Sequence, residues 1–259
     1  MGYAYRETVM EKENNTLKIV SALNPSTPLT DLSAWRDAFV AIDKNPGHWK
    51  EGRSACSLAQ YFLSGRGEPE VVATVNGILG DDSVECLERG EIECLCPFDA
   101  YRNPRRQDMG IWGRTKNGRR FFVGVEAKVD EPFSDDTLGS ALAKAGKTKI
   151  AKPKSCALDR IHGLCDWFDV SPEDETVRDL RYQLFHFTKG TADVADVDIR
   201  IMLLLTFHTP EYDSKKGEGN AADWKAFRNR FFVPVTGGYR LNVDKCQYPL
   251  FAVERVVGM

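Results

Sequence analysis

Two apolar runs separated by a short polar turn, within residues 106–133, constrain the fold of this chain more than any other feature. The turn is Thr115-Lys116-Asn117-Gly118, and an Asn-Gly pair between two apolar segments is typical of a β-hairpin. If the loop has three residues and Gly118 adopts a left-handed backbone conformation, Thr115 faces Arg119. The same register predicts that Asp108 lies directly across from Glu126.

Side chains of a strand alternate between its two faces, so this register divides the hairpin into an apolar and a polar side. We expect the apolar side to face the core, and it carries Met109, Ile111, Phe121, Val123, Val125 and Ala127. The polar side has two glycines that predict open space beside its charged groups, and it carries Asp108, Gly110, Trp112, Phe122, Gly124, Glu126 and Lys128. A two-residue Asn-Gly loop would instead bury an unpaired carboxylate, so the first register is favoured.

The charged residues of the polar side suit a metal-dependent reaction. Carboxylates on adjacent strands, here Asp108 and Glu126, are hard oxygen ligands of the kind that Mg²⁺ or Mn²⁺ takes together with water and substrate phosphate. Lys128 points to the same side and could orient an attacking water or stabilise charge that develops on phosphorus. The alternative is an ordinary surface ladder of ion pairs, but the predicted pairing of Asp108 with Glu126 joins like charges and is unfavourable unless a cation or Lys128 neutralises it.

An aspartate, a spacer and then Glu-x-Lys is a pattern that resembles the PD-(D/E)xK nuclease superfamily. Further blocks over residues 48–232 are similar to an uncharacterised bacterial and phage domain family that is regarded as PD-(D/E)xK-like. These blocks are Ser54-Ala55 with Leu58-Ala59, Pro69-Glu70-Val71, Glu126-Ala127-Lys128-Val129 with Glu131-Pro132-Phe133, and Leu180-Arg181-Tyr182-Gln183-Leu184 with His186.

The resemblance implies an α/β fold with a restriction-endonuclease-like core, in which helices cover both faces of a central mixed sheet. It implies hydrolysis of phosphodiester bonds with Mg²⁺ (or Mn²⁺) as the cofactor. Asp108 and Glu126 would bind this metal, and Lys128 would act in catalysis. Gln183 lies on a helix that follows the Glu-x-Lys strand, where several nucleases of this superfamily use a glutamine to orient the substrate or the metal site.

Two positions depart from the superfamily pattern. Gln107 stands where the proline of the motif is expected. No acidic residue on a helix ahead of the sheet matches clearly; Glu51 and Glu70 are the candidates, and Glu70 belongs to the better-matched block and is the candidate third metal ligand. Without a third carboxylate, the case for a second metal ion is weaker.

The substrate is expected to be nucleic acid, with DNA favoured over RNA, and the reaction that of a DNA endonuclease, with phage defence as a biological setting. The net charge of −3 gives no global basic field, so contacts to phosphate would come from local patches. The candidates are five lysines without an intervening acid, Lys144, Lys147, Lys149, Lys152 and Lys154, together with Arg181. A solvated segment is the alternative interpretation of the lysines.

Two other interpretations remain open. The chain could be an inactive nuclease fold that binds nucleic acid or a protein partner in phage–host conflict, which the acidic composition favours. It could also cleave RNA with the same residues, since contacts to the ribose 2′-hydroxyl cannot be inferred from a sequence. Many such enzymes cut duplexes as dimers, which leaves a homodimer open.

The composition places the chain among cytoplasmic globular proteins. With 259 residues, of which 42% are hydrophobic, it can build one sizeable core, and we expect a polar arm over 1–28 followed by a single domain over 29–259. No apolar run is long enough to span a membrane. Seven cysteines without a framework of spacings predict a reducing compartment and buried thiols rather than a zinc site.

The periodicity of apolar residues predicts the remaining elements. Helices are expected over 31–44, 54–63, 69–79, 134–144, 156–168, 176–187 and 223–232. Beyond the hairpin, strands are expected over 84–87, 92–96, 199–207 and 250–257, and 199–207 is apolar enough to be covered on both faces. A polar loop is expected over 209–220.

Overall fold

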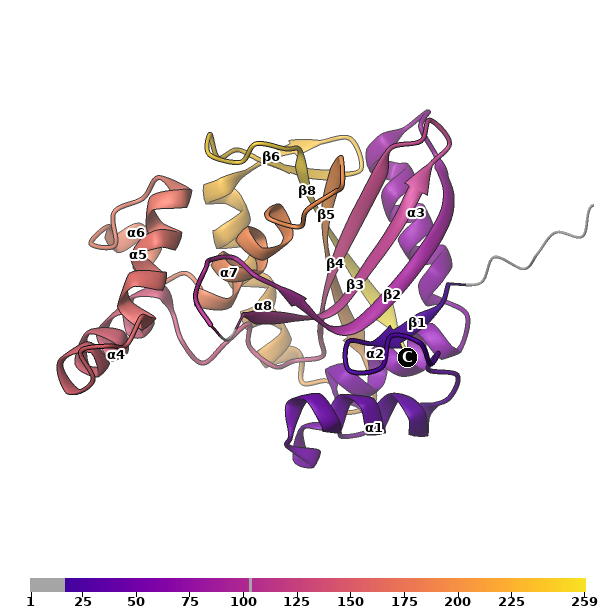
Figure 1. Ribbon diagram of the computed structural model, residues 1–259, viewed down its shortest axis with the longest axis horizontal. Helices are drawn as coiled ribbons and strands as arrows, with labels where there is room; N and C mark the ends of the chain where they lie inside the picture. The colour runs from indigo at the N-terminus through magenta and orange to yellow at the C-terminus, as the bar shows by residue number, and fades with distance from the viewer. Residues whose placement is uncertain (1–16, 103) are drawn as a thin grey trace, which may run out of the picture.

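A mixed sheet runs through the centre of the molecule, in a computed structural model that describes residues 17–102 and 104–259 (Figure 1). In the described part of the chain the sheet has eight strands in the order β1-β2-β3-β4-β5-β8-β7-β6. Strands β2, β3 and β4 are antiparallel, whereas β4, β5 and β8 are parallel. The strands are β1 (Ile19–Ser21), β2 (Val84–Cys96), β3 (Arg105–Thr115), β4 (Arg120–Lys128), β5 (Ile199–His208), β6 (Phe232–Val235), β7 (Gly238–Leu241) and β8 (Leu250–Gly258).

Helices cover both faces of this sheet, which confirms the predicted α/β class. One face packs against α1 (Leu32–Asp43), α2 (Ser54–Leu63) and α3 (Gly67–Leu79). On the other side, α7 (Tyr182–Ala192) and α8 (Ser214–Phe231) pack against the sheet, and α4 (Leu138–Ala151) and α5 (Ala157–Phe168) form an outer layer that joins the same hydrophobic core. Short turns of helix occur at Pro46–His48 and as α6 (Glu175–Arg178). None of these helices combines the length and the apolar character needed to cross a bilayer.

The central hairpin of β3 and β4 has the register that the sequence predicts. The Thr115 N–H donates to the Arg119 carbonyl at 2.9 Å, and Gly118 has a φ of 79°. Met109 pairs with Val125, so Asp108 and Glu126 come directly after the last paired position. The apolar side of the hairpin joins the core beneath α1, α2 and α3.

The polar side of the hairpin is packed, although its glycines predicted open space. A Cβ atom at Gly110 would lie 2.6 Å from Cys94 Sγ, and one at Gly124 would lie 2.1 Å from Gln107 Oε1. Gln107 Nε2 donates to Thr191 Oγ1 of α7 at 2.9 Å. The end of β2 and the start of β3 bend toward that helix (Figure 1). The space beside Gly110 is therefore filled by Cys94 and Phe122 of the sheet. The space beside Gly124 is filled by Gln107 and by Thr191 of α7.

Several boundaries differ from prediction because tertiary contacts extend the elements. The two strands predicted within 84–96 are one strand, whose polar middle pairs with β3 through register shifts. Helix α8 begins at Ser214, inside the predicted loop, because the Asp213 side chain accepts from the Lys215 N–H at 3.0 Å and Gly217 is buried. Helix α4 continues to Ala151.

Part of the predicted N-terminal arm packs onto the sheet. Leu17 and Ile19 are buried, and β1 pairs with β2 in parallel. The Gly90 N–H donates to the Lys18 carbonyl at 2.9 Å. Ile19–Ser21 are thus an edge strand of the sheet, and residues 1–16 lie outside the described part.

Two glycine substitutions are expected to change stability in opposite directions. Gly118→Ala should lower the free energy of unfolding by about 1 kcal/mol, because an L-residue in the left-handed conformation is strained. Gly146→Ala, in the middle of α4 where no atom lies within 4 Å of a new Cβ, should raise it by about 1 kcal/mol. Urea unfolding of both variants measures the effects. If both substitutions changed the free energy of unfolding in the same direction, the assigned backbone conformations of Gly118 and Gly146 would be wrong.

Candidate active site

Asp108 and Glu126 meet where the β3–β4 ladder ends. The Asp108 side chain crosses to β4, where its Oδ2 atom accepts the Ala127 N–H at 2.7 Å. This bond fixes the half-buried carboxylate beside the backbone that carries Glu126. Its other oxygen, Oδ1, is not engaged by this bond.

Glu126 is only 2% exposed, and two side chains hold it. Lys128 Nζ lies 2.8 Å from Glu126 Oε1, and Gln183 Nε2 donates to the same oxygen at 2.6 Å. Because Gln183 belongs to the first turn of α7, this helix is tied directly to β4. Asp108, Glu126, Lys128 and Gln183 are therefore one cluster, which brings together the four residues expected to be catalytic.

Two carboxyl groups share one ammonium group in this cluster. Burial raises the pKa of Asp108 well above its ordinary value, and the neighbouring Glu126 carboxylate raises it further. Burial alone would lower the pKa of Lys128, but Glu126 and Asp108 raise it above the usual value. Lys128 is thus held as a cation between two carboxylates that repel each other.

The cluster offers the oxygens of two carboxylates to a metal ion and, among the residues that the structure describes, does not form a closed cage. Glu126 Oε2 and Asp108 Oδ1 are the oxygens that the bonds described above do not engage. In residues 17–102 and 104–259, no three His, Cys, Asp or Glu side chains are grouped so that they could hold a metal ion. Mg²⁺ commonly uses one or two carboxylates and keeps several waters, so two carboxylates are sufficient for it.

Glu93 of β2 is a third carboxylate near this cluster that the sequence analysis missed. Its neighbours Ile92 and Cys94 pair with Met109 and Gln107, which places Glu93 opposite Asp108 in the sheet. Its φ of 48° is unusual for a residue other than glycine, and Arg106 Nη1 donates to its carbonyl at 2.8 Å. No motif marks this position. Only the β2–β3 register could have identified it, and the prediction of a strand over 92–96 did not include its pairing with β3.

The pKa of Glu93 predicts a pH dependence of stability. Burial raises this pKa from 4.5 to about 7, so between these values the folded protein keeps a proton that the unfolded chain releases. Stability should therefore fall as the pH rises from about 4.5 to 7, and Glu93→Gln should flatten this decline. Urea unfolding at several pH values measures it. Glu218→Gln, at an exposed position of α8, should keep the wild-type slope, and an unchanged slope in Glu93→Gln would disprove the assignment.

Glu70 does not join the site, which corrects the expectation of a metal ligand on a helix. Glu70 Oε1 accepts from Arg255 Nε of β8 at 2.9 Å. Its helix neighbour Val71 is buried in the core beneath α1, α2 and α3, on the sheet face opposite α7. Because Val71 faces this core, Glu70 lies on another side of α3, where it bonds to Arg255. Glu51, the other candidate, is exposed in the turn before α2.

The two acidic residues after Lys128 brace the site. The buried Asp130 carboxylate pairs with Arg53 and accepts the Asp213 N–H at 2.8 Å. Glu131 accepts the Ser54 N–H at 3.1 Å, which caps α2, and the Val129 N–H at 2.7 Å. The backbone that follows Lys128 is therefore fixed from both sides.

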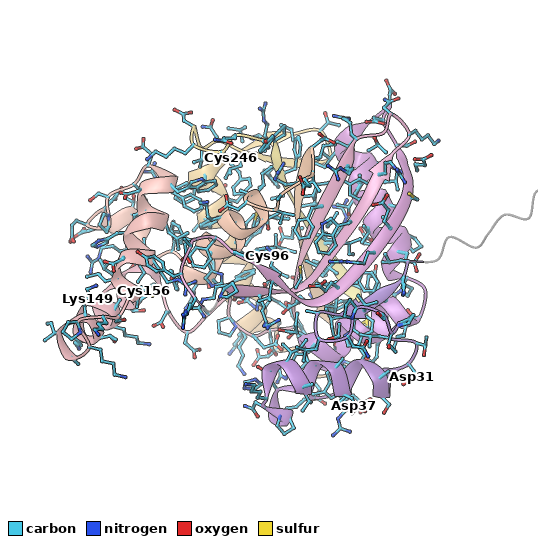
Figure 2. The ribbon with its side chains drawn as sticks, viewed as in Figure 1. Asp31, Asp37, Cys96, Lys149, Cys156 and Cys246 are labelled. Carbon is cyan, nitrogen blue, oxygen red and sulfur yellow. The ribbon has the colours of Figure 1, made fainter. Side chains whose placement is uncertain are left out.

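Three of the predicted phosphate-binding lysines (Lys144, Lys147 and Lys149) lie on α4, and Lys152 and Lys154 lie in the turn between α4 and α5. Lys144 pairs with Asp136 at 2.6 Å and Lys149 with Asp159 at 3.0 Å. Figure 2 shows Lys149 and Cys156 at the outer end of these helices, away from Cys96 near the middle of the molecule. The exposed members are Lys144, Lys147, Lys152 and Lys154.

Arg181 is used within the fold, whereas the sequence suggested a contact to nucleic acid. Its Nε donates to Asp223 of α8 at 2.7 Å, and its Nη1 donates to the Ser134 carbonyl at 3.1 Å. These bonds hold the start of α7 to α8 and to the segment after β4. These bonds within the fold are sufficient to explain the position of Arg181, and no contact to a ligand is needed.

Comparison with known proteins identifies a family. The family model described as "Domain of unknown function (DUF6946)" matches residues 28–253, so the chain belongs to that family. No curated protein and no solved structure matches the chain.

Proposed function

We propose that this protein is a nuclease that uses Mg²⁺ (or Mn²⁺) to hydrolyse phosphodiester bonds of DNA, built on a restriction-endonuclease-like core. The observation that carries the proposal is the grouping of four residues at the end of β4: Lys128 and Gln183 bond to Glu126, and Asp108 bonds to the Ala127 N–H beside it. Two carboxylates with unbalanced charge, next to a buried ammonium group, match the needs of phosphodiester hydrolysis.

Each residue of the cluster has a role that follows from its contacts. Asp108 and Glu126 would hold the metal ion, which when bound supplies a Lewis acid and lowers the pKa of water. The Ala127 N–H fixes the Asp108 carboxylate, and Gln183 fixes that of Glu126. Lys128, whose raised pKa keeps it charged, would orient the attacking water or stabilise the charge on the transferred phosphoryl oxygens.

A second candidate function is an inactive nuclease fold that binds nucleic acid or a protein partner. The observation that favours it is the contact of Lys128 Nζ with Glu126 Oε1 at 2.8 Å, which neutralises one carboxylate without any metal. The two functions differ in whether a divalent cation binds at Asp108 and Glu126.

Cleavage assays with the purified protein test the proposal. Supercoiled plasmid, linear duplex, single-stranded DNA and RNA are incubated with Mg²⁺, Mn²⁺ or EDTA, beside the Asp108→Asn and Lys128→Ala variants. We expect cleavage of DNA that requires the metal and is lost in both variants. Cleavage of RNA alone would change the substrate. Absence of cleavage, with no heat of Mn²⁺ binding in calorimetry, would favour the inactive module.

A further inference from the structure

A hollow of about 390 Å³ lies beside the candidate active site, between helices α4 and α5 and the start of α7. We call it the arginine hollow because Arg102, Arg105 and Arg160 contribute to its wall. Lys144 and Ala145 of α4 line it, as do Tyr182 and His186 of α7. Its volume is that of a site for one small molecule or one unit of a polymer.

The same elements build the arginine hollow and the active site. Arg105 and Asp108 belong to the same strand, β3. On α7, Gln183 reaches Glu126, while its neighbour Tyr182 lines the hollow. The charge of Lys128 also contributes to lowering the pKa of His186, after burial and the charges of Arg105 and Arg160. A strand of nucleic acid that crosses the active site would therefore reach the hollow.

Positive charge dominates the wall of the hollow. Four of its lining residues are Arg or Lys, and Asp136 is the single acid among them. Asp136 is paired with Lys144 at 2.6 Å, and outside the lining Asp99 accepts from Arg160 at 2.7 Å. Arg105 is exposed and lies over the Tyr182 ring, 6.0 Å from its centroid. Arg105 and Arg102 thus give the wall a net positive charge.

The inner side of the hollow is neutral. Burial lowers the pKa of His186 to about 3, so its imidazole carries no charge at neutral pH. The ring of His186 stacks on Phe98, at 5.9 Å between centroids, and contacts Tyr182 edge-on. Neutral aromatic groups behind a row of guanidinium groups suit a nucleotide, whose phosphate is anionic and whose base is flat.

We propose that the arginine hollow binds one nucleotide of the substrate strand next to the phosphodiester held at Asp108 and Glu126, with its phosphate on Arg105 and Arg102. This inference rests on the proposed nuclease function and names the part of the substrate that the site holds. Guanidinium groups are suited to this task because they donate two parallel hydrogen bonds to a phosphate.

Binding of labelled DNA in EDTA tests the inference without cleavage. Fluorescence anisotropy with single-stranded and duplex oligonucleotides is measured at several salt concentrations. Arg105→Ala should weaken binding by roughly tenfold or more, as expected for loss of a charge-assisted contact, and should reduce the salt slope by about 1. Arg102→Ala combined with Arg105→Ala should weaken it further. Arg105→Lys should restore part of the affinity, because it keeps the charge but not the paired donors.

Arg36→Ala, an exposed arginine of α1 on the opposite helix layer, is the matched control and should bind within twofold of wild type. Thermal unfolding of all variants checks that they fold. Wild-type affinity in Arg105→Ala and in the double variant of Arg102 and Arg105 would overturn the inference. Absence of DNA binding by the wild type would also overturn it. If binding depends on Arg105 but no metal-dependent cleavage occurs, the nuclease proposal fails while the nucleotide site stands. Cleavage with an unchanged KM in Arg105→Ala would refute the hollow and keep the nuclease.

Discussion

Glu126→Gln is expected to reduce metal-dependent DNA cleavage by roughly a hundred- to a thousandfold or more, the range for loss of one group that stabilises a charged transition state. Glutamine keeps the shape of the side chain, but it removes the negative charge that a metal ion requires and that holds Lys128 at 2.8 Å. Gln183 at 2.6 Å can still donate to the amide oxygen. The variant should therefore fold while its reaction fails. Single-turnover cleavage at saturating Mg²⁺ measures the effect.

The control for this variant is Glu85→Gln, which removes a carboxylate from the exposed side of β2. Glu85 lies 3.5 Å from Arg114, and its side chain is 56% exposed. It should cleave at the wild-type rate. Calorimetry with Mn²⁺ should show weaker binding in Glu126→Gln only. Full activity of Glu126→Gln would exclude the proposed site.

Phe185→Ala is expected to lower the free energy of unfolding by about 3–5 kcal/mol, the largest stability effect that we predict. Phe185 is fully buried on α7. Its ring packs against Phe168 at 5.0 Å, Phe227 at 5.1 Å and Phe231 at 5.6 Å between centroids. Deletion of the ring leaves a cavity between α5, α7 and α8 that rigid neighbours cannot fill. Urea unfolding followed by circular dichroism measures the loss.

Ile150→Ala is the matched control, since Ile150 is 84% exposed at the end of α4. It should change stability by less than about 0.5 kcal/mol. A loss below about 1 kcal/mol in Phe185→Ala would mean that α7 does not pack as described. Because Gln183 belongs to the same helix, partial loss of cleavage in Phe185→Ala at low temperature is also expected.

The parts of the fold that could be predicted are those that local sequence determines. The turn chemistry of Asn117-Gly118 sets the hairpin register, and the register sets the neighbours of Asp108. Helix α2 begins and ends where its apolar period does. The contact of Gln183 with Glu126 joins distant parts of the chain, and only the family resemblance suggested it.

The features that the sequence did not predict depend on contacts between distant segments. The first half of α8 is polar, but Asn220 donates to the Glu131 carbonyl at 2.6 Å, which holds it in place. Residues 19–21 carry too short an apolar run to predict a strand without the edge of β2 beside them. The sequence does not show which side of α3 faces the sheet. It therefore could not predict that Glu70 bonds to Arg255 of β8.

The brace behind Lys128 has a consequence for how the protein can be divided. Asp130 and Glu131 contact Arg53 and Ser54 at the start of α2, and Asp213 at the start of α8. A fragment that ends before residue 213 would retain the hairpin but lose one side of this brace. The first of two separately expressed fragments would carry all four residues of the site, and association with the second should restore the bond of Asp213 to Asp130. A cut near residues 209–213 would therefore test whether the brace from α8 is needed to hold the backbone after Lys128 in place.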